Sequence, residues 1–303
     1  MAEDNTESDE IMCCAGCGVK ENDDIKLKKC TACYLVRYCG VKCQKEHWSK
    51  HKRECKKRAA ELRDEFLFKQ PEGNHMGDCP ICFLPLSFEK SKSSLMPCCS
   101  KLICKGCLYV SMVREMEGTL EKRCPFCRHP TPESDEEIKT IFMKRVEAND
   151  PIAILQMGMK HEEEGDYKGA FEYLSKAAEL GNLDAHDHLG TKYLLGQGVE
   201  KDMKKSIFHL EKAAIGGLPE ARHNLASIEV ENGRVKRAIK HLIISAKQGF
   251  EESLISLKEA FETGYITKED FATALCAHKA AVDALNSPQR EAAEAFFLNK
   301  PSW

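Results

Sequence analysis

The stretch CQKEHWSKHKREC, residues 43–55, governs how the first third of the chain is interpreted. It carries six basic or imidazole side chains, one tryptophan, and a cysteine at each end. Two interpretations compete: a basic helix that contacts nucleic acid, or one wall of a metal site. His51 and Cys55 are four positions apart, so a helix would place both side chains on one face. This spacing favours the metal site, with the basic side chains on the outside of the helix.

Cysteines upstream extend this stretch into a regular ligand pattern. From Cys14 the chain reads C-x2-C-x12-C-x2-C-x5-C-x3-C-x7-H-x3-C. Two cysteines separated by two residues can point both thiolates at one ion from a single tight turn, and zinc takes four tetrahedral N or S ligands. Eight such side chains therefore predict two closed structural zinc sites. The predicted ligands are Cys14, Cys17, Cys30, Cys33, Cys39, Cys43, His51 and Cys55.

Two of these ligands have a neighbour of the same chemistry. Cys13 precedes Cys14 and could replace it, although the x2 spacing to the next cysteine favours Cys14. His47 also stands at helical spacing within the stretch, although His51 fits the x3 step to the final cysteine. We expect His47 to be a solvent-facing histidine of the helix.

The pattern resembles the MYND zinc finger over roughly residues 13–55, including the Cys-Gln start of the last helix and Trp48. In that family the ligands interleave between two ions. The resemblance implies one site of Cys14, Cys17, Cys39 and Cys43, and a second of Cys30, Cys33, His51 and Cys55. It also implies a groove for short proline-containing peptides, which Gln44 and Trp48 would line.

A second cysteine group reads C-x2-C-x15-C-C-x4-C-x2-C-x16-C-x2-C and again supplies eight ligands for two ions. Two of its pairs are CPIC and CPFC, in which proline stiffens the turn. The order resembles a RING finger over about residues 78–129. Lys101 stands where a RING carries a histidine, and a protonated lysine nitrogen is a poor zinc ligand. The adjacent Cys98 and Cys99 must then both bind, as in all-cysteine RING variants.

The RING resemblance implies a cross-braced ligand order and a partner. One ion would be held by Cys79, Cys82, Cys104 and Cys107, and the other by Cys98, Cys99, Cys124 and Cys127. A RING finger binds a ubiquitin-conjugating enzyme, and Ile81, Pro125 and Arg128 match positions used for that contact. Such a ligase orients a loaded thioester and does no covalent chemistry itself.

None of these four sites is expected to be catalytic, because a catalytic zinc keeps one position open for water. Modules of about 50 residues bury too little surface to fold alone. Structural zinc supplies roughly 10–16 kcal/mol in comparable peptides. We therefore expect four structural zinc ions per chain.

The chain changes character at about residue 150, where alanine, leucine and glycine rise. The segments YLSKAAELGNLDA, HLEKAAIGGLPEA and HLIISAKQGFEES echo one another, with Gly181, Gly217 and Gly249 spaced 36 and 32 apart. A period in the thirties with paired helices indicates an α-solenoid, and glycine after each second helix suits a left-handed cap. The motif from Leu189 to Asp202 resembles Sel-one-like repeats, which are related to tetratricopeptide repeats.

The repeats also yield expectations for single residues. We predict a stack core that includes Leu189, Tyr193, Leu194, Phe208 and Leu210. Cys276 is expected to be a buried apolar residue, and the scattered histidines of the repeats are not expected to bind metal. The residues Phe296, Phe297 and Leu298 cap the stack or, alternatively, form an exposed anchor.

Composition places the chain in a reducing compartment, the cytoplasm or nucleus. Of 17 cysteines, 16 lie before residue 128, and no apolar segment follows Met1 as a secretory signal would. Dense cysteine in such a chain indicates metal rather than disulfides. We expect no membrane span. The net charge of −3 makes nucleic acid an unlikely partner, although KHKRECKKR at 50–58 could serve nuclear import or phosphate contact rather than being a solvated helix face.

The predicted fold is multidomain: two small zinc-stabilised α+β modules and an all-α helical-repeat solenoid. Two functions remain open. The first is a RING-type ubiquitin ligase that holds a conjugating enzyme while the other modules bind substrate. The second is a non-enzymatic adaptor that binds proline-containing peptides and a protein on the solenoid. The predicted boundaries are an acidic disordered tail 1–12, MYND-type finger 13–58, helix and linker 59–77, RING-type finger 78–130, linker 131–149, repeats 150–285 and C-terminal tail or cap 286–303.

Overall fold

A computed structural model describes residues 13–119 and 121–298 of the chain. The expected acidic tail 1–12 and the last residues of the C-terminal tail, 299–303, lie outside the described residues. The chain divides into two compact units, Met1–Lys69 and Gln70–Trp303, which are described separately. Within the described residues, no helix is long and apolar enough to cross a membrane.

The first unit contains a short antiparallel sheet and a long helix. Strand β1 (Lys28–Lys29) pairs with β2 (Arg37–Tyr38), and helix α1 (Val41–Leu67) follows directly. The small core combines Leu27 and Tyr38 with buried cysteines. Helix α1 continues well past the expected module boundary at residue 58, because nothing in 56–66 breaks a helix. The expected finger helix and the expected linker helix are therefore one element.

The basic stretch of α1 faces solvent. His51 and Cys55 are its buried members, while the lysines and Arg53 around them are exposed. Lys57 and Arg58 pair with Glu61 across one helical turn. Such exposed pairs contribute only a few tenths of a kcal/mol each, so the charges mainly keep this face solvated.

The second unit begins with the RING-like module. A 3-10 turn η1 (Lys90–Lys92) leads into an antiparallel hairpin of β3 (Ser93–Met96) and β4 (Lys101–Cys104). Helix α2 (Lys105–Met116) starts immediately after β4, and its first turn is capped by the Cys104 side chain. The core joins Leu86 and Ile103 to buried cysteines. Two zinc-stabilised α+β modules are thus present, as the sequence predicts.

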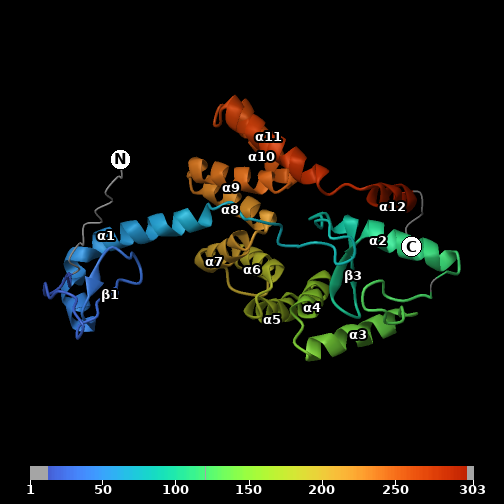
Figure 1. Cartoon of the computed structure of the whole chain (residues 1–303), viewed down its shortest axis with the longest axis horizontal. Coiled ribbons are helices and arrows are strands. Elements are labelled where there is room, and N and C mark those ends of the chain that lie inside the picture. The colour runs from blue at the N-terminus through green and yellow to red at the C-terminus, as the bar shows by residue number, and fades with distance from the viewer. Residues whose placement is uncertain (1–12, 120, 299–303) are drawn as a thin grey trace, which may run out of the picture. The chain divides into compact units, whose positions relative to one another are not determined.

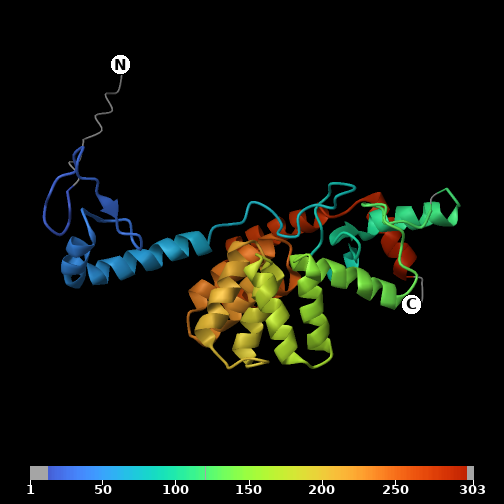
Figure 2. The ribbon, with the colours of Figure 1, turned by 90° about the horizontal axis from the view of Figure 1, so that it is seen from below.

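The solenoid is a series of helical hairpins, visible as parallel rows in Figure 2. The helices of the hairpins pack pairwise, and each hairpin packs on the next. Helix α3 (Asp135–Glu147) leads from the RING-like module into the stack. The hairpin helices are α4 (Pro151–Glu163), α5 (Tyr167–Glu179), α6 (Leu183–Leu195), α7 (Met203–Ile215), α8 (Pro219–Glu231) and α9 (Val235–Lys247).

One packing contact recurs through the hairpins. Gly158 of α4 lies against Leu174 of α5, and Gly190 of α6 lies against Leu210 of α7. A Cβ added to Gly190 would stand only 2.6 Å from Leu210 Cγ. The small residue lets the two helices of a hairpin approach closely, so the buried leucine fills the space between them. The same glycine–leucine contact therefore occurs in two successive hairpins.

Polar caps and glycines set the helix ends. Asp150, Asn182 and Asp202 each precede a helix and accept a hydrogen bond from its first-turn N–H groups. Each cap of this kind contributes about 1 kcal/mol. Gly181, with φ of +86°, follows α5 in the left-handed conformation, and the equivalent glycines at 217 and 249 do the same. The prediction of a glycine cap after every second helix is confirmed.

The hairpin pattern continues past the third repeat. Helices α10 (Glu251–Glu262) and α11 (Lys268–Asp283) pack on α9 and on each other. Their cluster includes Leu257 and Ala274, both fully buried. This pair covers the end of the stack.

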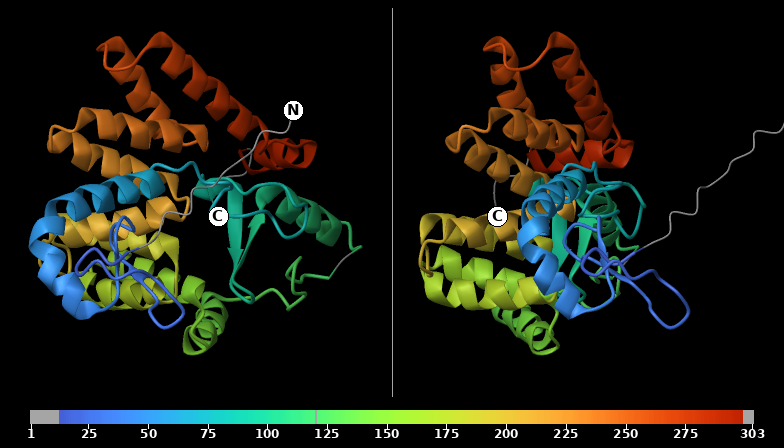
Figure 3. Two further views of the ribbon diagram at one scale, coloured as in Figure 1. Left: turned by 60° about the vertical axis from the view of Figure 1, so that its left-hand side comes forward. Right: turned by 90° about the vertical axis from the view of Figure 1, so that its left-hand side faces the viewer.

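The C-terminal helix α12 (Pro288–Leu298) lies against α2 of the RING-like module, as Figures 1 and 3 show. The rings of Phe296 and Tyr109 have centroids 5.0 Å apart. The expectation that Phe296, Phe297 and Leu298 cap the stack is therefore wrong. Phe296 and Phe297 contact a module that stands much earlier in the sequence, whereas Leu298 is exposed.

Two single-residue expectations are also wrong. Phe208 is 53 % exposed, because the buried face of α7 passes through Ser206 and Leu210 and leaves Phe208 off that face. Cys276 is exposed on α11. The other predicted core residues hold: Leu189, Tyr193 and Leu210 are buried, and Leu194 is partly buried.

Candidate metal centres and interaction surfaces

In the first unit, the eight predicted ligands gather into two clusters. Cys14, Cys17, Cys39 and Cys43 form one, and Cys30, Cys33, His51 and Cys55 form the other. Within each cluster the ligand atoms all lie within 4.8 Å of one another. The Sγ atoms of Cys39 and Cys43 are 3.5 Å apart, and His51 Nε2 is 3.3 Å from Cys33 Sγ. These separations suit four ligands around one tetrahedral ion.

In the second unit, the RING-like module shows the same arrangement. Cys79, Cys82, Cys104 and Cys107 lie together, as do Cys98, Cys99, Cys124 and Cys127. The Cys82 and Cys104 Sγ atoms are 3.7 Å apart, and those of Cys98 and Cys127 are 3.3 Å apart. The first and third cysteine pairs therefore share one site and the second and fourth pairs share the other. This alternation is the order that the RING resemblance implies.

Four of the five cysteine pairs separated by two residues share one backbone turn, whereas Cys104 and Cys107 lie at the start of α2. The N–H of the residue after the second cysteine donates to the carbonyl of the first cysteine, as Phe83 does to Cys79 over 2.9 Å. That following residue has positive φ in the left-handed region. The turn recurs after Cys17, Cys33, Cys82 and Cys127, at Gly18, Tyr34, Phe83 and Arg128. A side chain in this conformation is strained, and it persists here in the turns that bring two thiols to one point.

Three of these turns favour the thiolate of their first cysteine, which is the form that binds metal. A hydrogen bond from the Cys104 side chain, together with backbone N–H groups of Cys82 and Ile81, holds the pKa of Cys79 at about 4 against the effect of burial. Burial raises the pKa of Cys14 and of Cys30, but backbone N–H groups of their turns outweigh it and bring both pKa values to about 6. The donor set and its charge therefore fit zinc.

The adjacent Cys98 and Cys99 both reach their cluster because the hairpin between β3 and β4 turns tightly at this point. Ser100 has φ of +52° and donates its N–H to the Met96 carbonyl over 2.9 Å. Lys101 then begins β4 with an exposed side chain. The lysine takes no part in the cluster, as its chemistry predicts.

The ambiguous residues of the first unit lie apart from the clusters. Cys13 is exposed and pairs with Lys20 in an isolated bridge. His47 is half-buried, and its Nδ1 lies 3.1 Å from the Tyr38 hydroxyl. The expectation that His47 faces solvent is only partly right, because the ring also stacks beside His51 with centroids 5.9 Å apart.

The predicted conjugating-enzyme contacts line one groove of about 600 Å³ on the RING-like module. Ile81 comes from the first turn, and Pro125 and Arg128 come from the last. Helix α2 contributes Val110 and Arg114 to the same groove. Sequence reasoning missed these two, although their spacing of four on a helix that follows a ligand could have indicated a shared face.

The predicted peptide-groove residues lie on α1. Gln44 and Trp48 are four positions apart and therefore on one helix face. Gln44 is half-buried, and Trp48 is 42 % exposed. An exposed tryptophan beside an amide can hold an apolar ring and bond a carbonyl.

Comparison with known proteins identifies two families within the chain. Residues 14–55 match the MYND finger, and residues 151–182, 183–218 and 219–250 match the Sel1 repeat. Of the three resemblances inferred from the sequence, those to the MYND finger and to the Sel-one-like repeats are confirmed. The RING-like module, residues 78–130, lies outside both matched regions.

The curated relatives match parts of the chain. The histone-lysine N-methyltransferase ASHR1 of Arabidopsis thaliana is 51 % identical over 43 residues, covering 14 % of this chain and 8 % of the relative. The histone-lysine N-methyltransferase SMYD3 of Homo sapiens is 55 % identical over 31 residues, covering 10 % and 7 %. DAP3-binding cell death enhancer 1 of Mus musculus is 24 % identical over 202 residues, covering 54 % and 40 %. This chain spans less than half the length of each relative.

Solved structures similar to the chain include two repeat proteins. A Sel1 repeat protein from Oxalobacter formigenes aligns with a TM-score of 0.44 and 22 % identity, over 59 % of this chain and 71 % of that chain. The protective antigen c5321 of uropathogenic Escherichia coli, described as having an SLR fold, aligns with a TM-score of 0.40 and 22 % identity, over 57 % and 38 %.

Proposed function

We propose that this chain is a zinc-binding adaptor that joins protein partners through its MYND finger and its Sel1 repeats. The observation that carries the proposal is the completeness of the clusters. Each brings four protein ligands together, so a zinc ion held there has no open position for substrate or water. The ions would stabilise the modules, and the exposed surfaces of those modules would carry the function.

The first binding surface in this proposal is the face of α1 that presents Gln44 and Trp48. Proline-containing peptides adopt an extended conformation before binding and dock on aromatic surfaces at a low entropic cost. The exposed indole of Trp48 can pack against a proline ring. The Gln44 amide can donate to a peptide carbonyl or accept from a peptide N–H.

Peptide binding tests this surface directly. The zinc-loaded chain is titrated with arrayed proline-containing peptides, and bound peptides are compared between the parent and Trp48→Ala. We expect Trp48→Ala to weaken binding at least tenfold, whereas Lys50→Ala, an exposed change on the same helix, leaves binding unchanged. Equal binding by parent and Trp48→Ala, or no peptide bound by the parent, would reject the groove.

The second binding surface in this proposal is the solenoid. Stacked helical hairpins offer an extended surface suited to a protein rather than to a small molecule. The mouse relative whose match covers 54 % of this chain is named for binding the protein DAP3, which supports a protein as the ligand of such a chain.

A second candidate function is that of a RING-type ubiquitin ligase. The observation that favours it is the groove shared by Ile81, Pro125 and Arg128, since the RING resemblance assigns these residues to a conjugating enzyme. The exposed Arg128 side chain stands at the rim, where its planar guanidinium can bond carbonyls of two proteins at once. Every cysteine of the module is part of a cluster, so ubiquitin would pass directly from the conjugating enzyme to its substrate.

A discharge assay separates the two functions. Purified conjugating enzymes loaded with ubiquitin are mixed with free lysine, and loss of the thioester is followed with and without the chain. Faster discharge that is reduced at least tenfold by Arg128→Ala, but not by the exposed neighbour change His129→Ala, would establish the ligase. No acceleration with any conjugating enzyme of a broad panel would leave the adaptor as the function.

A further inference from the structure

Two arginines join the zinc clusters of the RING-like module to the helices on either side of the solenoid. Arg145 belongs to α3, which precedes the repeats, and Arg290 belongs to α12, which follows them. Arg145 contacts the loop of the cluster that contains Cys98, and Arg290 contacts the loop of the cluster that contains Cys82. Each cluster therefore has one cationic contact from outside the module.

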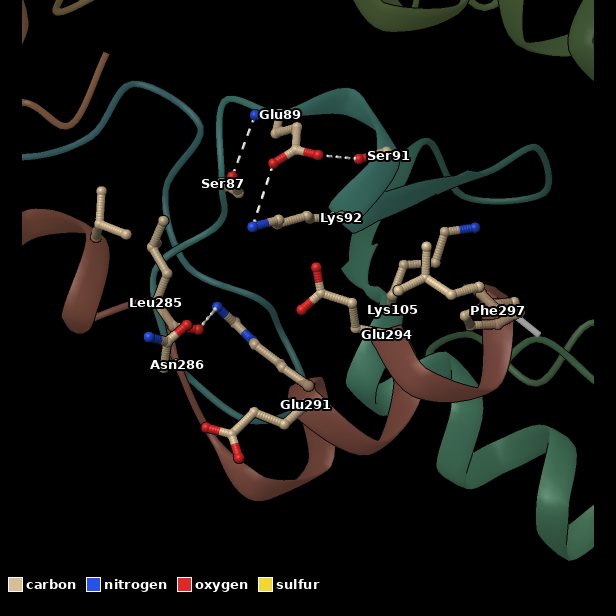
Figure 4. Close-up of a pocket in the computed structure, with 13 residues that line it drawn as sticks. Ser87, Glu89, Ser91, Lys92, Lys105, Leu285, Asn286, Glu291, Glu294 and Phe297 are labelled. Carbon is tan, nitrogen blue, oxygen red and sulfur yellow. Dashed lines mark hydrogen bonds and ion pairs between the residues drawn. The ribbon is translucent and has the colours of Figure 1, made fainter. Parts of the chain in front are cut away.

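Arg290 is bonded to the turn that carries Cys82. Its Nη1 donates to the Pro85 carbonyl over 2.8 Å, and its Nη2 donates to the Leu84 carbonyl over 3.2 Å. The same Nη2 lies 3.8 Å from Cys82 Sγ. A further bond from Nη1 to the Leu285 carbonyl, drawn in Figure 4, fixes the guanidinium to the start of its own helix. Three of these four contacts place the fork of the guanidinium on a single turn.

Arg145 makes an equivalent connection to the other cluster. Its Nε donates to the Ser100 hydroxyl over 2.7 Å, and its Nη1 lies 3.4 Å from the Cys98 carbonyl. The same Nε also donates to Asp150 Oδ2 over 2.7 Å, and Nη2 pairs with that carboxylate. Asp150 in turn caps α4 by accepting from the N–H of Ile152. A continuous polar chain therefore runs from a zinc loop to the first helix of the solenoid.

The packing of α12 on α2 explains why Arg290 is held in place. A Cβ at Gly106 would stand 2.9 Å from Arg290 Cγ and 3.0 Å from the Arg290 nitrogen, so glycine permits the two helices to touch here. Lys105 lies over the ring of Phe297, 4.9 Å from its centroid. Figure 4 shows Lys105 and Phe297 facing one another at this junction. The apolar contacts and the arginine therefore act at the same surface.

We propose that Arg145 and Arg290 are positioning residues for the two zinc sites of the RING-like module, so that zinc loading and the docking of α12 are one coupled equilibrium. The proposal rests on zinc occupancy of that module. It does not depend on adaptor or ligase activity, and it remains testable if both of those fail.

Charge and geometry both support this role. A zinc ion with four thiolates is doubly negative, and a nearby guanidinium reduces the cost of that charge in a partly buried setting. Hydrogen bonds to the loop carbonyls fix the orientation of the ligands, as outer contacts do at other metal sites. Because coupling between two equilibria is reciprocal, zinc must favour docking of α12 by the same factor by which docking favours zinc.

Cadmium-113 NMR of the fully substituted chain gives a direct readout of each site. Cys82→Ser and Cys99→Ser identify the resonances of the two module sites. We expect Arg290→Lys to shift the resonance assigned through Cys82 and Arg145→Lys to shift the one assigned through Cys99, with the two resonances of the MYND finger unchanged. Lysine keeps the charge and the length but not the fork. Resonances that stay in place in both variants would overturn the proposal.

The rate of zinc release measures how strongly Arg290 holds the ion in its site. The loaded protein is mixed with an excess of a chromophoric chelator, and the release rates of the individual zinc ions are compared. We expect one ion to leave about 10- to 100-fold faster in Arg290→Ala, the range typical of lost outer contacts. Glu291→Gln, an exposed neighbour on the same helix, should release zinc as the parent does. Release unchanged in Arg290→Ala would contradict the role of Arg290.

Hydrogen exchange tests whether bound zinc favours the docking of α12. This measurement does not need an arginine variant. Limited chelation that empties the module should increase exchange of the amides in α12 at least tenfold, while the amides of α6 and α7 keep their protection. Unchanged protection of α12 after the module has lost its zinc would overturn the coupling. If Arg290→Ala fails to fold, this measurement on the parent chain still decides the matter.

Discussion

The Tyr38 hydroxyl lies 3.1 Å from His47 Nδ1, and this contact separates two histidines that stand one helical turn apart. His47 is directed to the tyrosine, whereas His51 is buried and places Nε2 3.3 Å from Cys33 Sγ. The two rings stack with only 14° between their planes. Tyr38 therefore leaves His51 as the imidazole that enters the cluster.

The first prediction concerns these histidines. His51→Ala should reduce the zinc content of the purified chain by one ion, because three cysteines cannot complete a tetrahedral site. His47→Ala should keep the zinc content of the parent and lose only the contact with Tyr38. Metal analysis of both variants checks this expectation. A lost ion in His47→Ala together with full occupancy in His51→Ala would reverse the assignment.

The second prediction concerns thiol reactivity. Of the 17 cysteines, 15 belong to clusters, and Cys13 and Cys276 are exposed outside them. A thiol reagent should therefore label two sites rapidly in the zinc-loaded chain and all 17 after denaturation with a chelator. Zinc-bound thiolates react slowly because the metal holds their lone pairs.

Cys276→Ser provides the control for this count. It should reduce the rapid class from two thiols to one without altering the protected class. Four or more rapid thiols in the loaded parent would show that at least one cluster does not hold its ion.

The third prediction concerns the repeated helix contact. Gly190→Ala adds a methyl group 2.6 Å from Cγ of the fully buried Leu210. Overpacking costs about 1–3 kcal/mol, and the better helix propensity of alanine returns up to about 1 kcal/mol. We expect a net loss of about 1 kcal/mol in the free energy of unfolding, measured with urea by circular dichroism.

Gly73→Ala is the matched control, because an added Cβ at Gly73 meets no atom within 4 Å. Its unfolding midpoint should stay close to that of the parent. A gain in stability from Gly190→Ala would mean that the hairpin does not need the close approach.

The fourth prediction concerns the pH dependence of the solenoid. Burial, with a smaller effect from the charges of Arg222 and Arg237, lowers the pKa of His241 to about 3. An unfolded histidine has a pKa of about 6.5, so the unfolded chain binds more protons below that value. The stabilising effect of the neutral ring is complete above pH 6.5 and decreases as the pH falls toward 3.

Urea unfolding at pH 7 and 5.5 measures this effect. From the linkage relation His241 should account for about 1 kcal/mol of stability lost over that interval. His241→Gln, which has no proton to gain, should show a correspondingly smaller loss, and zinc release affects parent and variant alike. Equal losses in the two proteins would exclude His241 as the source.

Most of the confirmed predictions about the fold and the metal clusters came from the spacing of residues close in sequence. A cysteine pair with two intervening residues fixes its own turn, and the four ligand sets that the MYND and RING resemblances imply are the sets that lie together. The period of Gly181, Gly217 and Gly249 likewise marks the left-handed caps after every second helix. In both cases the residues that interact are close in sequence or are repeated, and their pattern contains the geometry.

The remaining features depend on contacts between distant segments. Phe296 and Phe297 show that the C-terminal helix needs an apolar partner. The sequence around them does not tell whether that partner is Tyr109 or the end of the stack. Arg290 and Cys82 are 208 positions apart, and an arginine in a polar tail resembles any surface charge. The prediction that Phe208 is buried is wrong for a different reason. The rotation of a helix about its axis, and not hydrophobicity, determines which of two neighbouring apolar residues is buried.

The links at residues 145 and 290 have a mechanical consequence. A row of helical hairpins anchored at one end can bend and extend, because each hairpin contacts only its neighbours. Here α3 and α12, which flank the row of hairpins, are both attached to the RING-like module. The row is therefore anchored at both ends. A partner that seats on the hairpins therefore meets a surface of restrained curvature, and any bending force that it applies is transmitted to the loops that hold zinc.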